Sequence, residues 1–516
     1  MESWLFYYGG VCLVILLILR RKIRNYQGLP LVGHLPFFAL QSRQQLLEWI
    51  YRGTEYHEGR SWRIDVPFIG KGWIIENPAC LKDVLSSKHD SFGKGELAST
   101  RMKDLFGEGI ILVEGHKWKA QRLAGQHAFS SNANLQSFGE RILPKHLNTL
   151  LAPFERSIER DEELDVQAVA YDYAMVVFGE LAYDSDFART SAAFTAPFER
   201  ASTVTQDRFT NPLYRLTERL LPSGRRFQRD VAEVKAFGER LVKSMTERIK
   251  AEEEGKVDVP GVGGSKDLDG STIRQGLLLR ELVKEHGQGD DYSFLADACL
   301  NFLTAGKDTT AQALAWTLYE ILRNPAIYAE LQAEIDKAPT ELSVSNLTAV
   351  EGPLQYANAV ISESLRLHPP VPLEIHENIT SAPIVLADGT LVGPAEIVLW
   401  SPWAMGRSTR IWGQDAGDFK PSRWFPEVQS RKSDRSSTIH PLKKSAFEFP
   451  VFHAGPRSCL GKNLARIELA YALVQLVKRY DMVPTWPLNQ ERSVGTALTA
   501  PILGGLGVRA RHRQKI

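Results

Sequence analysis

A cysteine near the C-terminus lies where its thiol could do chemistry. Residues 452–464 read FHAGPRSCLGKNL, with Cys459 in the middle. A phosphate-binding loop is disfavoured, because Gly455 and Gly461 are too far apart for a Walker loop and Asn463 stands where its Ser or Thr belongs. The cysteine, and not the phosphate-loop pattern, is therefore the candidate reactive group.

The residues that follow Cys459 predict a helix that begins just beyond it. KNLARIELAYALVQLVKRY is amphipathic, so Cys459 should lie at or just before a helix N-terminus, where the dipole and unpaired N–H groups favour thiolate over thiol. Arg457 adds positive charge, and Gly461 would let a flat ligand approach. A free cysteine is more often a small buried hydrophobe, but that interpretation requires none of these neighbours.

An acid and an alcohol occupy adjacent positions in the stretch AGKDTT. A threonine inside a helix can donate back to the carbonyl four residues earlier, which for Thr309 is that of Ala305. Gly306 removes a side chain and is expected to leave space, while Asp308 adds a carboxyl whose ionisation is costly if the helix is buried. The alternative is an ordinary helix bend with an ion-paired aspartate.

Two further groups of residues could stabilise the fold or bind an anionic ligand. Glu363 and Arg366 in ESLR share a helix face and, with Arg423 of FKPSRW, predict either a buried ionic cluster or a surface salt bridge. Trp118 and Arg122 in GHKWKAQR share another face, which favours an anion-binding edge or an exposed amphipathic helix.

The elements that position these residues are mostly helices of one domain. A long, nearly all-apolar helix is predicted from after Asp291 to Pro325, and it should be buried at the centre of the fold. Pro369 ends the ESLR helix, and residues 62–76 predict two short strands around a glycine turn. The segments 255–271 and 427–445 are predicted to be exposed loops.

Composition and the N-terminus narrow the functional class. The chain has 516 residues and a formal net charge of +1, so charge offers no argument for nucleic-acid binding, and its four scattered cysteines indicate no disulfide framework. Residues 4–19 are uncharged and are followed by RRKIR, which predicts a membrane anchor with the body on the cytosolic side.

Together these motifs resemble the cytochrome P450 family. FHAGPRSCLG matches the FxxGxRxCxG cysteine-ligand pattern, AGKDTT the oxygen-activation motif, ESLR the ExxR motif and FKPSRW the later arginine motif, in the family's order. The resemblance covers the chain from the anchor to the end. It implies a mainly α fold, a triangular helical domain with small β-sheets, preceded by one transmembrane helix.

The resemblance also implies residue roles. Cys459 would be the iron ligand, shielded by Phe452, and Asp308 and Thr309 would relay protons during oxygen activation. Haem contacts would come from Arg457, Trp118, Arg122, His376 and Gly461, and the structural cluster from Glu363, Arg366 and Arg423. The substrate pocket would include Ile110, Phe302, Ala305, Val371, Leu373 and Leu498. His376, Ser422 and Gly406 depart from common family usage, where Arg, Glu and His are frequent.

The implied activity is a monooxygenase reaction using haem b, O₂ and NADPH electrons from a separate NADPH-cytochrome P450 reductase, with cytochrome b5 as an additional donor to consider. The substrate class would be a fatty acid or alkane, or a fungal terpenoid or polyketide of secondary metabolism. Two alternatives are a haem-thiolate isomerase or dehydratase acting on peroxides and a non-catalytic haem- or lipid-binding protein; the acid–alcohol pair disfavours both.

The domain organisation implied is an anchor at 1–22, a basic, proline-rich hinge at 23–36 and a haem-thiolate domain at 37–516. The expected location is the endoplasmic reticulum membrane, crossed once, with the catalytic domain in the cytosol.

Overall fold

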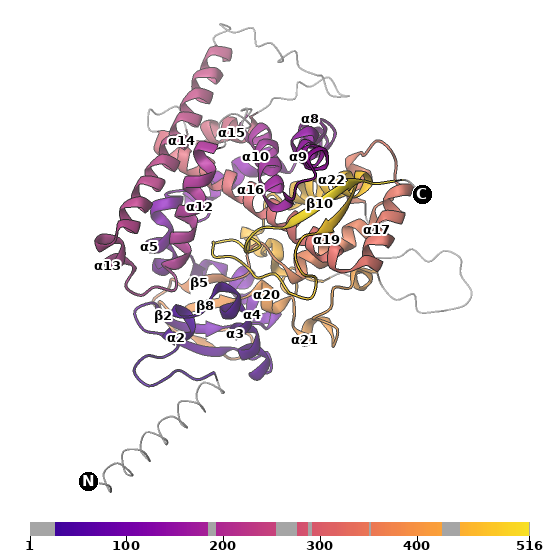
Figure 1. The fold of residues 1–516 in the computed structure, drawn as a ribbon. Coiled ribbons are helices and arrows are strands. Elements are labelled where there is room, and N and C mark those ends of the chain that lie inside the picture. The colour runs from indigo at the N-terminus through magenta and orange to yellow at the C-terminus, as the bar shows by residue number, and fades with distance from the viewer. Residues whose placement is uncertain are drawn as a thin grey trace.

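The computed structural model describes residues 26–183, 192–253, 276–286, 292–349, 352–425 and 444–514. The chain is mainly helical with small sheets, as expected (Figure 1). The predicted anchor at 1–22 and the first hinge residues lie outside these ranges. Among the helices that are described, none combines the length and apolar character needed to cross a membrane.

Helices make up most of the described chain. Their bounds are α2 (Leu35–Ala39), α3 (Arg43–Tyr56), α4 (Pro78–Lys82), α5 (Gly95–Phe106), α6 (Gly115–Phe129), α7 (Asn132–Ser137), α8 (Leu143–Lys145), α9 (Leu147–Arg160), α10 (Val166–Tyr183), α12 (Ala192–Asp207), α13 (Tyr214–Leu220), α14 (Pro222–Glu253), α15 (Leu277–His286), α16 (Tyr292–Arg323), α17 (Pro325–Lys337), α18 (Val344–Thr348), α19 (Gln355–Leu367), α20 (Pro402–Met405), α21 (Thr409–Trp412) and α22 (Lys462–Arg479). Short 3₁₀ or π segments cover Asp83–Ser87, His89–Ser91, Phe138–Ile142, Pro421–Trp424, Pro450–Phe452 and Gly455–Arg457.

The strands form three small sheets. A five-stranded sheet has the order β1-β2-β8-β5-β3, a three-stranded sheet the order β4-β10-β9, and β6 pairs with β7. Their bounds are β1 (Trp62–Val66), β2 (Gly70–Ile74), β3 (Phe92–Gly93), β4 (Leu164–Asp165), β5 (Glu374–Asn378), β6 (Ile384–Val385), β7 (Leu391–Val392), β8 (Ile397–Trp400), β9 (Tyr480–Pro484) and β10 (Gly507–His512). The predicted hairpin within 62–76 is confirmed, with Trp62 opposite Ile74.

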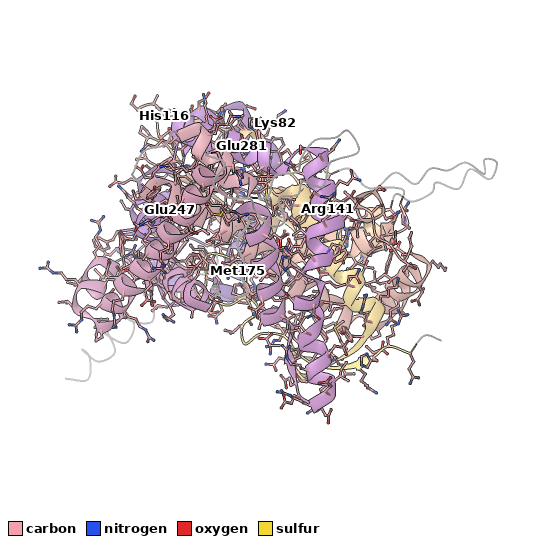
Figure 2. All side chains as sticks on the ribbon, turned by 90° about the horizontal axis from the view of Figure 1, so that it is seen from above. Lys82, His116, Arg141, Met175, Glu247 and Glu281 are labelled. Atoms are coloured by element: carbon pink, nitrogen blue, oxygen red, sulfur yellow. The ribbon has the colours of Figure 1, made fainter. Side chains whose placement is uncertain are left out.

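The predicted central helix is confirmed as α16. It ends at Arg323, before Pro325, and most of its side chains are buried all round the circumference. It packs against α10, α14, α19 and α22, which surround it in Figure 1. In Figure 2 Met175 of α10 lies in the middle of the molecule, whereas the exposed Lys82 and His116 lie at its edge. The helix therefore carries AGKDTT through the core.

The expected hinge at 23–36 is partly helical at its end. Residues 28–34 form turns, with a bridge between Leu29 and Gly33, but Leu35 and Pro36 already begin α2. Proline is tolerated in the first helical turn, where its missing N–H would have no helical partner. The predicted loop at 255–271 lies outside the described residues, as does 427–443 of the predicted loop at 427–445.

Candidate active site

The loop that carries Cys459 is held by backbone contacts from several directions. The Cys459 N–H donates to the Phe452 carbonyl at 2.8 Å, and α22 begins at Lys462 with Gly461 as its N-cap. Arg122 of α6 donates to the Ser458 carbonyl at 2.8 Å. The prediction that Cys459 lies just before a helix N-terminus is confirmed. Its side chain is exposed, but the surface it exposes faces an internal cavity.

The thiol's ionisation is governed by opposing effects. Burial is the largest and raises the pKa of Cys459, whereas the N–H groups of Gly461 and Lys462 and the charges of Arg122 and Lys462 lower it. The N–H groups at the start of the helix lower the pKa as expected, but the helpful charges come from Arg122 and Lys462 and not from Arg457. Desolvation outweighs all of these groups, so the unligated thiol is not favoured as a thiolate. A bound metal cation would reverse this balance, since a coordinating thiol loses its proton.

Gly455 permits the turn of this loop. Replacing it should displace Cys459 from its native position. Its φ is +66°, and a Cβ would lie 1.8 Å from the Leu85 carbonyl oxygen. We expect Gly455→Ala to destabilise the protein by at least ~2 kcal/mol and to lower its haem content, because both left-handed strain and a backbone clash oppose the native loop. Haem absorbance per protein and the thermal midpoint measure this. Gly417→Ala, whose Cβ would meet nothing within 4 Å, is the matched control and should behave as wild type.

The predicted anion-binding residues come together beside the cysteine loop. The indole of Trp118 lies between two guanidiniums, with Arg457 Cζ 4.7 Å and Arg122 Cζ 5.7 Å from its ring centroid. Arg457 also donates to the Val113 carbonyl at 2.9 Å and forms an ion pair with Glu114. The two arginines and the indole therefore form one edge of the cavity.

Two basic residues at the same edge were missed by the sequence argument. Lys94 and His453 both line the cavity, and His453 Nε2 lies 3.5 Å from a carboxylate oxygen of Glu374. Lys94 lies outside every motif, so no sequence signal identifies it. His453 is a variable position within the FxxGxRxCxG pattern.

His376 is the predicted haem contact that does not line the cavity. Both of its ring nitrogens are buried without a hydrogen-bond partner in the described part of the chain, and its ring packs 5.2 Å from that of Trp400. Burial holds the pKa of His376 well below its usual range, and the charges of Lys94, His453 and Arg457 act in the same direction. His376 is therefore a neutral ring outside the cavity lining. Its contact with haem stays a prediction.

The central helix α16 contributes an alcohol to the cavity lining. Thr309 Oγ1 donates to the Ala305 carbonyl at 2.6 Å, as predicted, and both residues line the cavity. Gly306 lines the cavity beside Thr309, in agreement with the space expected there. Its missing side chain also lets the ring of Phe178 approach, because a Cβ at Gly306 would lie 2.2 Å from that ring. The glycine serves close packing between α16 and α10.

A buried lysine accompanies the acid. Lys307 is 0% exposed, and its Nζ lies 2.7 Å from Oδ1 of Asp308 and 4.7 Å from the ring centroid of Tyr171. The two charged groups are close, but neither Lys307 Nζ nor Asp308 Oδ1 has a hydrogen bond among the described residues. The side chains of these two consecutive residues do not align the donor with the acceptor. The ion-paired aspartate weighed in the sequence argument is present, and its carboxyl remains able to accept a hydrogen bond.

One cavity of about 510 Å³ joins these groups. Its lining includes Cys459, Phe452 and Gly461 on one side and Asp308 and Thr309 on another. All six residues expected in the substrate pocket also line it, namely Ile110, Phe302, Ala305, Val371, Leu373 and Leu498. The space between the thiol and the alcohol is therefore mostly apolar.

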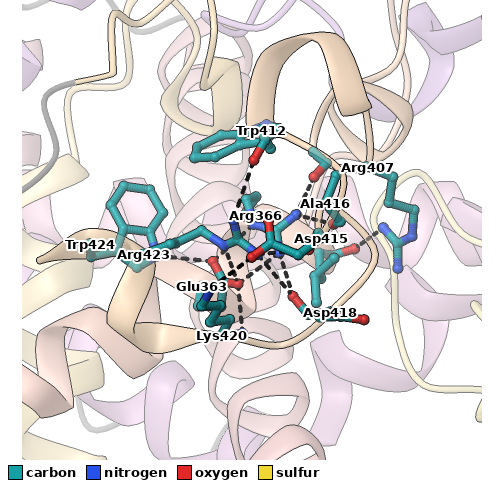
Figure 3. Close-up of polar contacts among 12 residues, drawn as sticks. Glu363, Arg366, Arg407, Trp412, Asp415, Ala416, Asp418, Lys420, Arg423 and Trp424 are labelled. Carbon is teal, nitrogen blue, oxygen red and sulfur yellow. Dashed lines mark hydrogen bonds and ion pairs between the residues drawn. The ribbon is translucent and has the colours of Figure 1, made fainter. Parts of the chain in front are cut away.

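The predicted Glu363–Arg366–Arg423 cluster is buried, which excludes the surface salt bridge (Figure 3). Arg366 donates to both carboxylate oxygens of Glu363 at 2.7 and 2.8 Å, and Arg423 Nε donates to the same carboxylate at 2.7 Å. Arg366 also donates to the carbonyls of Gly406, Ala416 and Asp418. A Cβ at Gly406 would lie 2.0 Å from the Arg366 carbonyl oxygen, which explains the glycine at that position.

The side chains at the cavity fit a haem. A thiol faces the cavity from the start of α22, and cationic and N–H groups lie beside it for the two propionates. The rest of the lining is mostly apolar, with polar exceptions that include the acid–alcohol pair. This combination of one soft metal ligand, anion-binding groups at one edge and apolar faces matches an iron porphyrin better than a hydrated ion.

Comparison with known proteins agrees with this geometry. A family model described as Cytochrome P450 matches residues 24–501. The chain is similar to "Cytochrome P450 94A1" of Vicia sativa, with 28% identity over 94% of this chain and 90% of the relative. It is also similar to "Cytochrome P450 monooxygenase cyp1" of Mycosarcoma maydis, with 28% identity over 96% and 76%. "Cytochrome P450 CYP94D109" of Paris polyphylla is 30% identical over 86% of each chain.

Proposed function

Since the chain belongs to the cytochrome P450 family, we propose that it inserts one oxygen atom of O₂ into an apolar organic substrate held between Cys459 and Thr309. As a member of this family it is a monooxygenase that uses haem b, dioxygen and NADPH-derived electrons delivered through a reductase. The observation that carries the proposal is that the thiol of Cys459 and the hydroxyl of Thr309, 150 residues apart in the chain, line one apolar cavity.

The haem would be held by residues of two segments, α6 and the loop that leads into α22. Cys459 is the proposed iron ligand, Arg457, Arg122 and Trp118 the proposed partners of the propionates, and Phe452 shields the thiolate from water. When bound, haem supplies the site at which dioxygen is reduced, and thiolate ligation favours O–O cleavage. The Gly461 and Lys462 N–H groups would then stabilise the sulfur's negative charge.

Protons would reach the cavity through the acid and the alcohol. The Asp308 carboxyl lines the cavity and would accept and pass on a proton there, while Lys307 keeps the carboxyl from being buried without a counter-charge. At rest, Thr309 Oγ1 donates its proton to the Ala305 carbonyl. The oxygen can still accept a hydrogen bond through a lone pair, and rotation of the hydroxyl would let it donate into the cavity. The two groups together supply general acid catalysis next to the haem face.

The substrate class proposed is a long apolar molecule, either a fatty acid or alkane or a terpenoid or polyketide scaffold. The support is the lining by Ile110, Phe302, Val371, Leu373 and Leu498, which offers hydrophobic contact and few hydrogen bonds.

We also propose the partner, domain limits and location. Electrons would come from a separate NADPH-cytochrome P450 reductase, and cytochrome b5 would be a second donor. Residues 1–22 would form a single-pass anchor in the endoplasmic reticulum membrane, 23–36 a hinge, and 37–516 the cytosolic haem-thiolate domain. The support is the uncharged run at 4–19 followed by RRKIR.

The proton-delivery role of Thr309 is tested by Thr309→Ala. We expect substrate oxidation to fall about a hundredfold, because one general acid is lost, while NADPH is still consumed and its electrons appear as hydrogen peroxide. Thr317→Ala is the matched control, since Thr317 lies on the same helix and donates to the Ala313 carbonyl at 2.7 Å but does not line the cavity.

Product per NADPH, with reductase present, measures the coupling in both variants. Equal coupling in Thr309→Ala and Thr317→Ala would contradict the assignment. Conversion of a peroxide without NADPH would instead favour the isomerase or dehydratase alternative.

A further inference from the structure

Arg43 occupies a position in α3 where the sequence pattern calls for an aliphatic side chain. It shares a helix face with Leu46, Leu47 and Ile50, which are 0–2% exposed. Arg43 itself is 8% exposed, although it belongs to the first turn of the helix. A guanidinium therefore lies on the buried face of an amphipathic helix.

This guanidinium has no partner within the described residues. Its Nε is buried without a hydrogen bond, and no carboxylate pairs with the side chain. Burial lowers the pKa of Arg43 to about 10, and no neighbouring charge contributes, so the group stays cationic near neutral pH. A buried charge without a partner costs free energy that the folded protein must offset elsewhere.

Other buried arginines of the chain are paired. Arg208, 3% exposed, forms ion pairs with Glu218 at 2.7 Å and with Asp104 at 2.8 Å. Arg101 donates to the Arg208 carbonyl at 2.9 Å, and Arg366 belongs to the Glu363 cluster. Arg43 differs from these three because it has no partner within the part of the chain that the structure describes.

Arg43 lines the cavity of the active site. Phe38, Leu46, Ile64 and Val66, from α2, α3 and β1, line the same cavity, and so do Cys459 and Thr309. An amphipathic molecule in this cavity could therefore place an anionic group at Arg43 while its apolar part extends toward Thr309.

We propose that Arg43 binds the carboxylate of an amphipathic substrate and so selects carboxylic acids over neutral molecules of the same length. The proposal rests on the function proposed above and specifies its substrate class. Guanidinium donors form a planar fork that matches a carboxylate, and a pair formed away from water is strong. With the head group at Arg43, the hydrocarbon chain is the part that reaches Thr309 and Cys459.

The test compares acids with their esters on the holoenzyme. Saturated straight-chain carboxylic acids of increasing length, each with its methyl ester, are titrated into wild type and Arg43→Met while the haem spin-state spectrum is followed. We expect wild type to bind at least one acid more tightly than its ester, and Arg43→Met to weaken that acid's binding by about tenfold to a hundredfold while leaving the ester nearly unchanged. Arg43→Lys should be intermediate, because it keeps the charge but loses the fork.

Arg52→Met is the control on the same helix, because the Arg52 side chain is 70% exposed and does not line the cavity. It should keep the wild-type preference. Arg43→Met is expected to unfold at no lower temperature than wild type, since it removes an unpaired buried charge. If Arg43→Met fails to fold, the ratio of acid affinity to ester affinity in Arg43→Lys decides whether the proposal holds.

Two results would overturn the proposal: no acid preferred over its ester by wild type, or equal weakening of both ligands in Arg43→Met. Failure of the proposed function appears differently. In that case acids would bind in an Arg43-dependent manner, but neither acid nor ester would be oxidised with NADPH and reductase.

Discussion

Cys459→Ala is expected to abolish monooxygenase activity and the thiolate signature of the haem. The reduced wild-type protein exposed to carbon monoxide should show the strongly red-shifted absorption of a thiolate-ligated haem, and the variant should not, because alanine offers no metal ligand. Product formation with NADPH and reductase should fall to background. The effect is large because the change removes the proposed bond between protein and iron and leaves the rest of the cavity intact.

The matched control is Cys80→Ala, because Cys80 is fully buried and lies outside the cavity lining. It should keep both the absorption and the activity. Retention of the red-shifted absorption by Cys459→Ala would contradict the assignment of the iron ligand. Haem that binds to Cys459→Ala without the signature would agree with it, since Arg457, Arg122 and Trp118 remain.

Glu363→Gln is expected to cause the largest loss of stability. The carboxylate accepts hydrogen bonds from Arg366, Arg423, the Lys420 N–H and the Trp424 indole. A neutral amide would leave two buried guanidiniums without their counter-charge, which costs about 3–5 kcal/mol. Because folded proteins are stable by only about 5–15 kcal/mol, we expect little soluble, haem-loaded protein, as measured by yield and denaturant unfolding.

Lys420→Met tests whether the loss of stability in Glu363→Gln arises because that ion cluster is buried. The Lys420 side chain is 54% exposed and its Nζ lies 2.9 Å from Asp415, so losing this surface pair should cost less than about 1 kcal/mol. The backbone N–H of Lys420 still donates to Glu363 in this variant. Similar losses of stability in Glu363→Gln and Lys420→Met would show that the cluster is not essential to the fold.

Most of the site could be predicted from local sequence. The start of α22 just after Cys459, the full extent of α16 and the Thr309 to Ala305 hydrogen bond follow from apolar periodicity, prolines and short-range bonding. The shared face of Glu363 and Arg366 follows from their spacing on one helix. Such features depend on residues within a few positions of one another, so the order of residues contains the information.

Other features depend on packing between distant segments. Gly306 lines the cavity as expected, but its close packing against the ring of Phe178 could not be read from its own segment. The sequence argument expected the helix N-terminus to favour the Cys459 thiolate, but the desolvation caused by surrounding elements raises the pKa. Lys94 and Arg43 carried no motif and were overlooked, although both line the cavity.

The amino-acid sequence alone determined the family, the helices that carry the reactive groups and the identity of the thiol and the acid–alcohol pair. The tertiary structure alone decided that Arg43 lines the active-site cavity, buried and without a partner among the described residues, and that the Glu363 cluster is buried. The physical reason is that burial and charge pairing are properties of a three-dimensional neighbourhood. That neighbourhood is assembled from segments hundreds of residues apart, and no local pattern encodes it.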